Sequence, residues 1–142
     1  MANVRPAETP DLPAIRDLSA QLGYDVPVDE LAARFRDFQA QPGTAVLVAE
    51  ENGRVAGYAV LSIRRDLAHP AWTELLDLCV DDRVRGKGLG ALLLRAAEAW
   101  ARSQECAGIT LGTRDTRRDA HRFYEREGFT LEKLHRIYKK KL

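Results

Sequence analysis

The middle of the chain holds a short segment whose glycines and cations could bind phosphate. Residues Arg83 to Gly90 read RVRGKGLG and lie between a β-rich run and an apolar stretch with helical spacing. Glycines let successive backbone N–H groups turn toward one point, and a helix N-terminus adds unpaired donors and a partial charge of about +0.5. Arg83, Arg85 and Lys87 would add positive charge at the rim. The segment predicts a diphosphate site, although a tight connection with a solvated basic rim uses the same residue types.

Two other phosphate motifs do not describe this segment. A P-loop ends in Gly-Lys-Ser/Thr, whereas here Gly86-Lys87 is followed by Gly88. The dinucleotide-binding fingerprint spaces its glycines as Gly-x-Gly-x-x-Gly, whereas Gly86, Gly88 and Gly90 are each two residues apart. Neither an ATPase nor a dehydrogenase is indicated.

The elements around the loop follow from hydrophobic spacing. A strand is predicted over Thr73 to Val80, and a helix over Gly88 to Ser103. A short strand over Ile109 to Gly112 and a short helix over Asp119 to Arg126 come next. The buried stripe of the long helix is expected to consist of Leu89, Leu92, Leu93, Ala96, Ala97 and Trp100.

The first half of the chain reads as a strand, two helices and a hairpin. The first helix begins at Leu12 with Asp11 as its N-cap, and the turn signal Glu51 to Arg54 joins the two hairpin strands. The expected elements are a strand over Asn3 to Ala7, helices from Leu12 to Leu22 and from Val28 to Pro42, and strands over Thr44 to Ala49 and Val55 to Ile63.

The order of these elements predicts the fold class. With a final hairpin-like pair over Phe129 to Tyr138, the order is βααβββαβαβ, without an internal repeat or a low-complexity linker. Such a mixture predicts an α/β (α+β) fold, with a central mixed, mostly antiparallel sheet flanked by helices. We expect a single domain over residues 1–142.

Composition excludes several classes of protein. With 45% apolar and 30% charged residues, the chain is typical of a globular protein. Its net charge of +1 provides no overall field toward nucleic acid or an anionic membrane. Apolar runs such as Leu89 to Leu94 are too short to cross a bilayer, and Met1 to Glu8 lacks the apolar run of a secretory signal. We expect a cytoplasmic protein without nucleic-acid or membrane partners.

Cysteine and histidine offer little for metal or covalent chemistry. Cys79 and Cys106 lie in segments that are predicted as buried strands, and no Cys-x-x-Cys spacing accompanies them. We interpret both as core thiols; a nucleophilic cysteine with a distant histidine partner is the alternative. The chain has three histidines, of which His69 and His135 have no partner nearby in the sequence, so no metal site is expected.

Two segments resemble motifs of the GNAT superfamily of N-acetyltransferases. The coenzyme A loop of that family reads Arg/Gln-x-x-Gly-x-Gly/Ala, a pattern satisfied here in two overlapping frames, from Arg83 and from Arg85. The family's second motif, Ala-x-x-Phe-Tyr-x-x-x-Gly-Phe, resembles Ala120 to Phe129. The clear matches run from about Glu74 to Phe129, and the part before them matches the family only in topology.

The resemblance implies acetyl-coenzyme A as cosubstrate. It also implies that the strand near Leu78 to Val80 splays from its neighbour, so that freed backbone groups pair with pantetheine and a backbone N–H faces the thioester oxygen. The coenzyme-binding residues that the resemblance carries over are Leu78, Cys79, Val80, Arg85, Gly86, Lys87, Gly88, Leu89 and Gly90, with Cys79 contributing its backbone.

Arg117 departs from the family pattern, which often has asparagine three residues before the alanine of the second motif. A positive side chain there could meet a coenzyme phosphate, so Arg117 is kept as a candidate coenzyme-binding residue. The alternative is a solvated residue in the first turn of the helix, which is the commoner state of a surface arginine.

Tyr124 and Glu74 are the candidate catalytic residues. The resemblance implies that Tyr124 lies near the coenzyme sulfur as general acid, and a phenol with an ordinary pKa of about 10 holds its proton at neutral pH. We assign the neighbouring Phe123 to packing. Glu74 matches a position where several family members carry a glutamate that removes the amine proton, although an exposed strand carboxylate or an ion pair with Arg64 or Arg65 would explain it equally well.

Two further side chains compete for these roles. Asp77 lies three residues from Glu74 on the same strand, and regular alternation would put the two on opposite faces, so that only one could face a given pocket. Asp77, or water, is therefore the alternative base. His121 precedes Tyr124 by one helical turn, although a solvent-facing histidine is the simpler interpretation.

The sequence therefore predicts an N-acetyltransferase that moves an acetyl group to a primary amine of a small molecule. We expect direct attack in a ternary complex, without a metal or a covalent enzyme intermediate. The acceptor should meet Leu22 to Val26 and Leu134 to Ile137. The alternatives are a protein or peptide acetyltransferase, acting on N-termini or lysines, and a non-catalytic acyl-coenzyme A sensor. A β-rich C-terminus would leave an unpaired edge, which keeps homodimerisation open.

Overall fold

The computed structural model describes residues 2–142. The chain forms two compact units, residues 1–111 and 112–142, which are described separately as the N-terminal and the C-terminal unit.

The N-terminal unit is built on a five-stranded sheet with the strand order β1-β2-β3-β4-β5. Its first four strands pair antiparallel, and β5 pairs parallel with β4, which confirms the predicted mixed, mostly antiparallel sheet. The strands are β1 (Ala2–Pro6), β2 (Thr44–Glu51), β3 (Arg54–Arg64), β4 (Trp72–Val80) and β5 (Ile109–Thr110).

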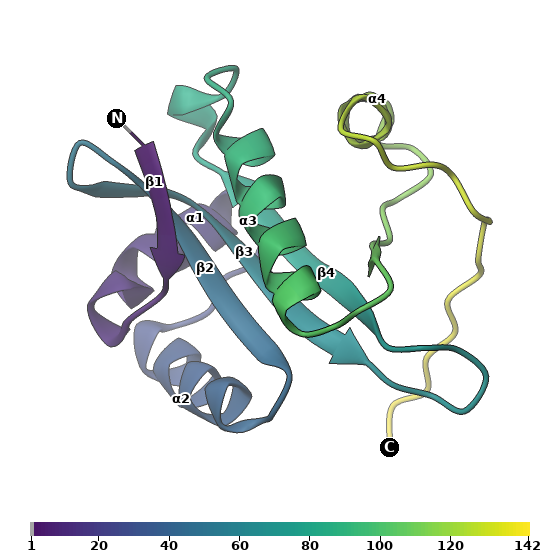
Figure 1. The fold of residues 1–142 in the computed structure, drawn as a ribbon. Coiled ribbons are helices and arrows are strands. Elements are labelled where there is room, and N and C mark those ends of the chain that lie inside the picture. Colours follow the sequence, from purple (N-terminus) through teal and green to yellow (C-terminus); the bar gives the residue numbers. More distant parts are fainter. Residues whose placement is uncertain (1) are drawn as a thin grey trace. The chain divides into compact units, whose positions relative to one another are not determined.

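Helices cover both faces of this sheet (Figure 1). The helices α1 (Leu12–Gln21) and α2 (Val28–Ala40) pack on one face, and α3 (Leu89–Ser103) packs on the other. Short 3-10 turns, η1 (Thr9–Asp11) and η2 (Asp82–Val84), lead into α1 and away from β4. Strand and helix bounds agree with the sequence prediction to within two or three residues.

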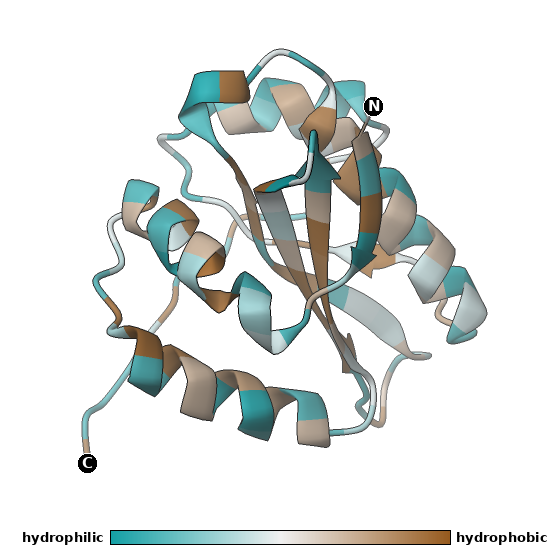
Figure 2. Cartoon of the chain, turned by 90° about the vertical axis from the view of Figure 1, so that its left-hand side faces the viewer, coloured by the Kyte–Doolittle hydropathy of each residue, from teal (hydrophilic) through white to brown (hydrophobic). Residues whose placement is uncertain are grey.

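Alternation along β3 divides the core into two layers. Ala59 and Leu61 are fully buried on the side of α3, whereas Tyr58 packs with the α1 residues Ile15 and Leu18. Figure 2 shows hydrophobic colour along the central strands. Apolar side chains on both faces of the sheet are typical of a sheet that is covered twice.

The register of β3 and β4 shifts by one residue in the middle of the pair. Val60 pairs with Asp77, whereas the next residue, Leu61, pairs with Leu75, so that Leu76 is left without a partner. A β-bulge of this kind breaks the strict alternation of side chains. Ser62 pairs with Glu74. Since Val60 and Ser62 lie on one face of β3, Glu74 and Asp77 share that face too, toward α1 and α2, and the prediction of opposite faces was wrong.

One edge of β4 is open over most of its length. Strand β5 is paired with β4 only at Thr73 and Glu74. Within residues 2–142, β4 has no strand partner on that side from Leu75 to Val80. This opening agrees with the splayed strand that the family resemblance implies, and it leaves backbone donors and acceptors available to a ligand.

Two further predictions in the N-terminal unit need correction. The Asp11 carboxylate does not cap α1; it accepts hydrogen bonds from the Glu8 N–H and from the Arg5 guanidinium, at 2.7 and 2.8 Å, and so holds the turn η1. Cys106 lies in the turn after α3 and not in a strand, and it is only half-buried.

The C-terminal unit contains one helix, α4 (Arg118–Arg126). The predicted hairpin-like pair over Phe129 to Tyr138 is not present: residues 129–142 form no strand. Leu131, Leu134 and Ile137 are exposed there, so these apolar residues have no sheet face to cover. The prediction of a β-rich C-terminus, on which the possibility of a homodimer rested, is therefore wrong. Among the described residues, no helix is long and apolar enough to span a membrane.

Candidate active site

The glycine-rich segment between β4 and α3 forms an open cradle of backbone donors. Gly86 and Gly88 have φ values of +83° and +82°, which L-residues with side chains rarely adopt. The backbone N–H groups of Gly86, Lys87, Gly88 and Leu89 donate to no acceptor within residues 2–142. A Cβ added to Gly88, the N-cap of α3, would meet no atom within 4 Å. The cradle thus offers unpaired donors and free space, which suits an anionic group such as a diphosphate.

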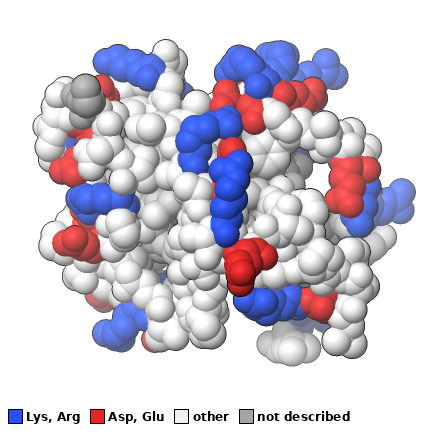
Figure 3. Space-filling model, viewed as in Figure 1, with Lys and Arg blue, Asp and Glu red and all other residues white. Residues whose placement is uncertain are grey.

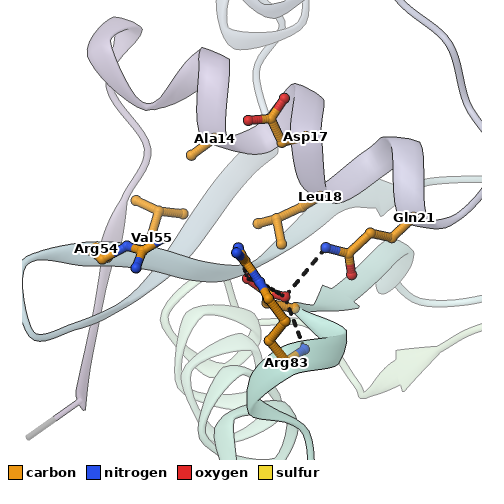
Figure 4. A pocket seen from close by; sticks show the side chains of 8 residues that line it. Ala14, Asp17, Leu18, Gln21, Arg54, Val55 and Arg83 are labelled. Atoms are coloured by element: carbon orange, nitrogen blue, oxygen red, sulfur yellow. Dashed lines mark hydrogen bonds and ion pairs between the residues drawn. The ribbon is translucent and has the colours of Figure 1, made fainter.

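Asp81 holds the start of this segment in place. Its carboxylate accepts hydrogen bonds from the N–H and the guanidinium of Arg83, at 3.0 and 2.8 Å, and from the amide of Gln21 at 3.3 Å. The Gln21 side chain also accepts the Asp82 N–H at 2.9 Å. Figure 4 shows the bonds that Asp81 accepts from Gln21 and Arg83, beside a recess of about 250 Å³. Together with the Asp82 bond, they tie the end of α1 to the end of β4. The Arg83 hydrogen bonds hold the pKa of Asp81 far below its ordinary value.

This anchor separates the three cations of the segment. The guanidinium of Arg83 is occupied by Asp81. Arg85 and Lys87 are exposed, and Arg85 uses only its Nε, which donates to the Val80 carbonyl at 3.3 Å. The arrangement therefore favours Arg85 over Arg83 as a cation for a bound anion. Sequence reasoning missed Asp81 and Gln21, although an acid two residues before Arg83 was a visible signal.

The end of β4 places three predicted coenzyme-binding residues beside the open edge. Leu78 and Val80 are half-buried, and Cys79 is buried with its thiol donating to the Leu18 carbonyl at 3.3 Å. Burial raises the pKa of the Cys79 thiol to about 11, so it stays protonated at neutral pH. Cys79 is thus a core thiol, as predicted.

A cavity of about 530 Å³ lies between α1, α2 and the sheet. Asp77 contributes the only carboxylate from the sheet, and Tyr58 lines the same cavity beside Tyr24 and Val26 of the loop between α1 and α2. Asp77 has no hydrogen-bond or ion-pair partner among residues 2–142. Burial therefore raises the pKa of its carboxyl. The remaining lining is largely apolar, from Leu12, Ile15, Leu31, Phe35, Phe38, Val46 and Val60.

Glu74 lies three residues before Asp77 on the same face of β4, where β5 begins to pair. It is half-buried and does not line the cavity. The ion pair with Arg64 that was an alternative role for Glu74 does not form, because Arg64 pairs with Asp66 at 3.6 Å. Within the described residues, the Glu74 carboxylate has no ion-pair partner.

The C-terminal unit holds Tyr124 in a small aromatic cluster. Its ring packs edge-on against Phe123 and Phe129, with centroids 5.2 and 5.7 Å away. Burial raises the pKa of the Tyr124 phenol, and the positive charge of Arg117 opposes this, so the phenol holds its proton at neutral pH. Arg117 itself is exposed and is the N-cap of α4. His121 is half-buried, with its Nε2 2.9 Å from the Arg114 carbonyl oxygen.

Charge at these sites is local. In the view of Figure 3, positive and negative side chains are interspersed over the surface, in agreement with the net charge of +1. The unpaired N–H groups of the cradle and the unpaired Asp77 carboxylate are therefore the features that would select ligands by charge.

Fold and sequence both relate this chain to known proteins. Residues 12–129 match the acetyltransferase (GNAT) family. The aminoalkylphosphonate N-acetyltransferase of Salmonella typhimurium is 37% identical over 113 residues, which are 79% of this chain and 71% of the relative. The aminoglycoside N(6')-acetyltransferase type 1 of Klebsiella aerogenes is 27% identical, with 98% of this chain and 96% of the relative covered.

A solved structure has the same fold. The aminoglycoside N-acetyltransferase AAC(6')-Iy, in complex with coenzyme A, superimposes with a TM-score of 0.89 at 21% identity, and the match covers 100% of this chain and 96% of that chain. The chain therefore belongs to the GNAT family of acetyltransferases and is an acyltransferase.

The unpaired Asp77 carboxylate predicts that Asp77→Asn stabilises the protein at neutral pH. Burial raises the pKa of the Asp77 carboxyl, so the folded protein holds this proton more tightly than the unfolded chain does. The stability gained from the protonated carboxyl is therefore complete below the pKa of Asp77 in the unfolded chain. It is lost as the pH rises through the higher pKa of Asp77 in the folded protein. Asparagine does not titrate. Urea unfolding should show a gain of roughly 0.5–2 kcal/mol at pH 7, which shrinks as the pH falls through the raised pKa of the folded state and is absent below about pH 4.

Asp29→Asn is the matched control, since Asp29 is exposed in the first turn of α2 and does not line the cavity. It should lower stability by about 0.3–1 kcal/mol, because it removes a negative charge from a helix N-terminus. An Asp77→Asn variant that is no more stable than the wild type at pH 7 would contradict an unpaired, desolvated carboxylate.

Proposed function

We propose that this protein transfers an acetyl group from acetyl-coenzyme A to a primary amine of a small molecule, by direct attack in a ternary complex. The observation that carries the proposal is the cradle of unpaired N–H groups at Gly86 to Leu89, which lies next to the open edge of β4. Because the family match runs from residue 12 to 129, we also propose that both units form one acetyltransferase domain.

Coenzyme binding follows from the donors available. The cradle would hold the diphosphate, with Arg85 and Lys87 adding charge and Gly90 continuing the N-terminus of α3. The backbone of Leu78 to Val80, including Cys79, would pair with pantetheine along the open edge of β4. Arg117 is exposed and would be available to a coenzyme phosphate. The coenzyme supplies the thioester that makes the acetyl group transferable.

The proposed reaction has a simple proton balance. The neutral amine nitrogen attacks the thioester carbonyl carbon, and a backbone N–H of β4 stabilises the oxyanion. Glu74 takes the proton that the amine loses, directly or through water. As the carbon–sulfur bond breaks, Tyr124 gives its proton to the departing thiolate. The products are an N-acetylated amine and free coenzyme A, and exchange of one proton with solvent at each of Glu74 and Tyr124 restores the enzyme.

A small-molecule acceptor fits the N-terminal unit better than a protein does. A cavity of about 530 Å³, half-open and apolar, is in the size range of small-ligand sites. The relatives named for aminoalkylphosphonate and aminoglycoside acetylation support the same class of acceptor. Release of free coenzyme A from acetyl-coenzyme A, measured over a panel of amines and peptides, tests the proposal. Turnover with peptides alone would favour a protein acetyltransferase, and binding without turnover would favour an acyl-coenzyme A sensor.

The cradle predicts that Gly88→Val weakens coenzyme A binding strongly. A β-branched side chain would project into the free space before the N–H groups and would also be strained at a φ of +82°. Gly53→Val is the matched control, since Gly53 has a φ of +74° and open space in the turn between β2 and β3. Calorimetry should show at least about a tenfold loss of affinity for Gly88→Val only. Unchanged affinity in a folded Gly88→Val variant would remove the cradle from the site.

If Glu74 is the base, Glu74→Gln should lower the rate by about 10²–10⁴-fold at neutral pH. The loss should be smaller at high pH, where the free amine is abundant without help. Asp77→Asn is the comparison, because Asp77 lies on the same face of the same strand. Both variants are measured at saturating acceptor. A larger loss of turnover in Asp77→Asn than in Glu74→Gln would transfer the role of base to Asp77.

Tyr124→Phe should keep the aromatic cluster and lose the proton donor. The ring contacts with Phe123 and Phe129 remain, so stability should change little, while turnover falls by about 10²-fold or more. A fall of only about tenfold would indicate positioning of the thioester. Tyr138→Phe is the control, because the side chain of Tyr138 is exposed. Wild-type turnover of Tyr124→Phe at saturating acetyl-coenzyme A would exclude the role.

A further inference from the structure

The cavity between α1, α2 and the sheet contains a charge that nothing in the N-terminal unit neutralises. Asp77 is half-buried, and its carboxylate has no hydrogen-bond or ion-pair partner within residues 2–142. Removing a carboxylate from water without a partner costs free energy. Retaining such a group in a cavity is understandable where a ligand supplies the missing positive charge.

The neighbours of Asp77 suit an ammonium group. Tyr58 and Tyr24 line the same cavity, and the Tyr58 hydroxyl also has no hydrogen-bond partner among the described residues. Burial, and then the negative charge of Asp77, raise the pKa of Tyr58, which places the two groups within electrostatic reach. A phenol oxygen can accept a hydrogen bond from an ammonium group, and tyrosine rings attract cations.

The other charges at the cavity do not cancel this one. Arg34 and Asp37 of α2 lie at the lining, both exposed, and Arg34 pairs with Glu30 at 3.6 Å. Asp37 adds a second negative charge. The cavity therefore presents carboxylates to its contents, with the one cationic side chain of its lining already engaged.

We infer that Asp77, Tyr58 and Tyr24 form a subsite for a second ammonium group of the acceptor, so that the acceptor is a small diamine or polyamine. This inference rests on the proposed function. The subsite holds the amine that does not react, because the proposed base for the reacting amine, Glu74, does not line the cavity that contains Asp77. An acceptor with an anionic group in place of the second amine would be repelled by Asp77.

The bulge in β4 places Asp77, which lines the cavity, and Glu74, which does not, on one face of the strand. Glu74 and Asp77 share a face of the strand and lie three residues apart, about 10 Å in an extended strand and somewhat less across a bulge. A chain of a few methylene groups between two amines can span this separation when hydrogen bonds are added at each end. The apolar side chains that line the cavity, such as Ile15 and Leu31, would contact that chain.

Three amines with the same carbon skeleton test the subsite: 1,4-diaminobutane, butylamine and 4-aminobutanoate, which end in a cation, a methyl group and an anion. Steady-state rates are measured with the full chain at saturating acetyl-coenzyme A. The wild type should have the lowest KM for the diamine, about tenfold or more below that for butylamine, and the highest for the amino acid.

Asp77→Asn should raise the KM for the diamine about 10- to 100-fold and abolish the discrimination among the three amines. Tyr58→Phe should raise the KM for the diamine by a few-fold. Asp29→Asn removes an exposed carboxylate outside the cavity and should leave all three KM values unchanged. Equal wild-type KM values for diamine and butylamine would overturn the inference. So would an Asp77→Asn variant that loses turnover equally with all three amines and keeps its KM values.

A direct binding measurement separates this inference from the proposed function. Calorimetry of the coenzyme A complex with 1,4-diaminobutane needs no turnover. Binding to the wild type that is lost in Asp77→Asn and kept in Asp29→Asn supports the subsite even if no amine is acetylated. Absence of diamine binding to the wild type overturns the subsite, even where butylamine is acetylated and the proposed function stands.

Discussion

The register shift between β3 and β4 is the constraint on which the organisation of the N-terminal unit depends. One residue of β4, Leu76, has no partner on β3, and the strand on either side of it keeps its antiparallel pairing. A bulge bends and twists the strand that carries it. Here the open edge of β4 begins at the same place: β5 pairs up to Glu74, and from Leu75 onward the edge is free. The unpaired residue Leu76 thus lies where the side chains of β4 change their alternation and where the edge of β4 loses its partner strand β5.

The loop that follows is prepared for an anion before any ligand arrives. Left-handed backbone at Gly86 and Gly88 turns the N–H groups outward, and the free energy that this conformation costs is met on folding. A ligand then needs to order little of the protein, which reduces the entropic cost of binding. The charge is equally local, because a chain with a net charge of +1 has no general attraction for phosphates.

Much of the fold and part of the site follow from the sequence alone. Glycine spacing in Arg83 to Gly90 and the apolar spacing of α3 are local signals, and the structure contains the loop and the helix that they predict. The buried stripe of α3 differs in part from the predicted one and consists of Leu89, Leu93, Leu94, Ala97 and Ala101. The bulge is not local. Whether Glu74 and Asp77 share a face depends on how β4 pairs with β3, and alternation within one strand contains no information about a register shift in a pair. The same limit applies to Phe129 to Tyr138, whose apolar residues are interpreted as a hairpin-like pair, because the sequence does not show whether a partner strand lies beside them.

The hydrogen bonds around Asp81 connect the last turn of α1 to the glycine-rich segment that follows β4. Gln21 donates to Asp81 and accepts from Asp82, so opening of either segment breaks bonds of the other. Local unfolding of α1 at its C-terminus is then thermodynamically linked to unfolding of the loop, and a ligand that holds one state of the loop also slows amide exchange in the helix. The helix that ends at Gln21 leads directly into Tyr24 and Val26, which line the cavity. Anion binding at the cradle and ligand binding in the cavity between α1, α2 and the sheet can therefore be coupled through these side-chain bonds, which is a form of cooperativity.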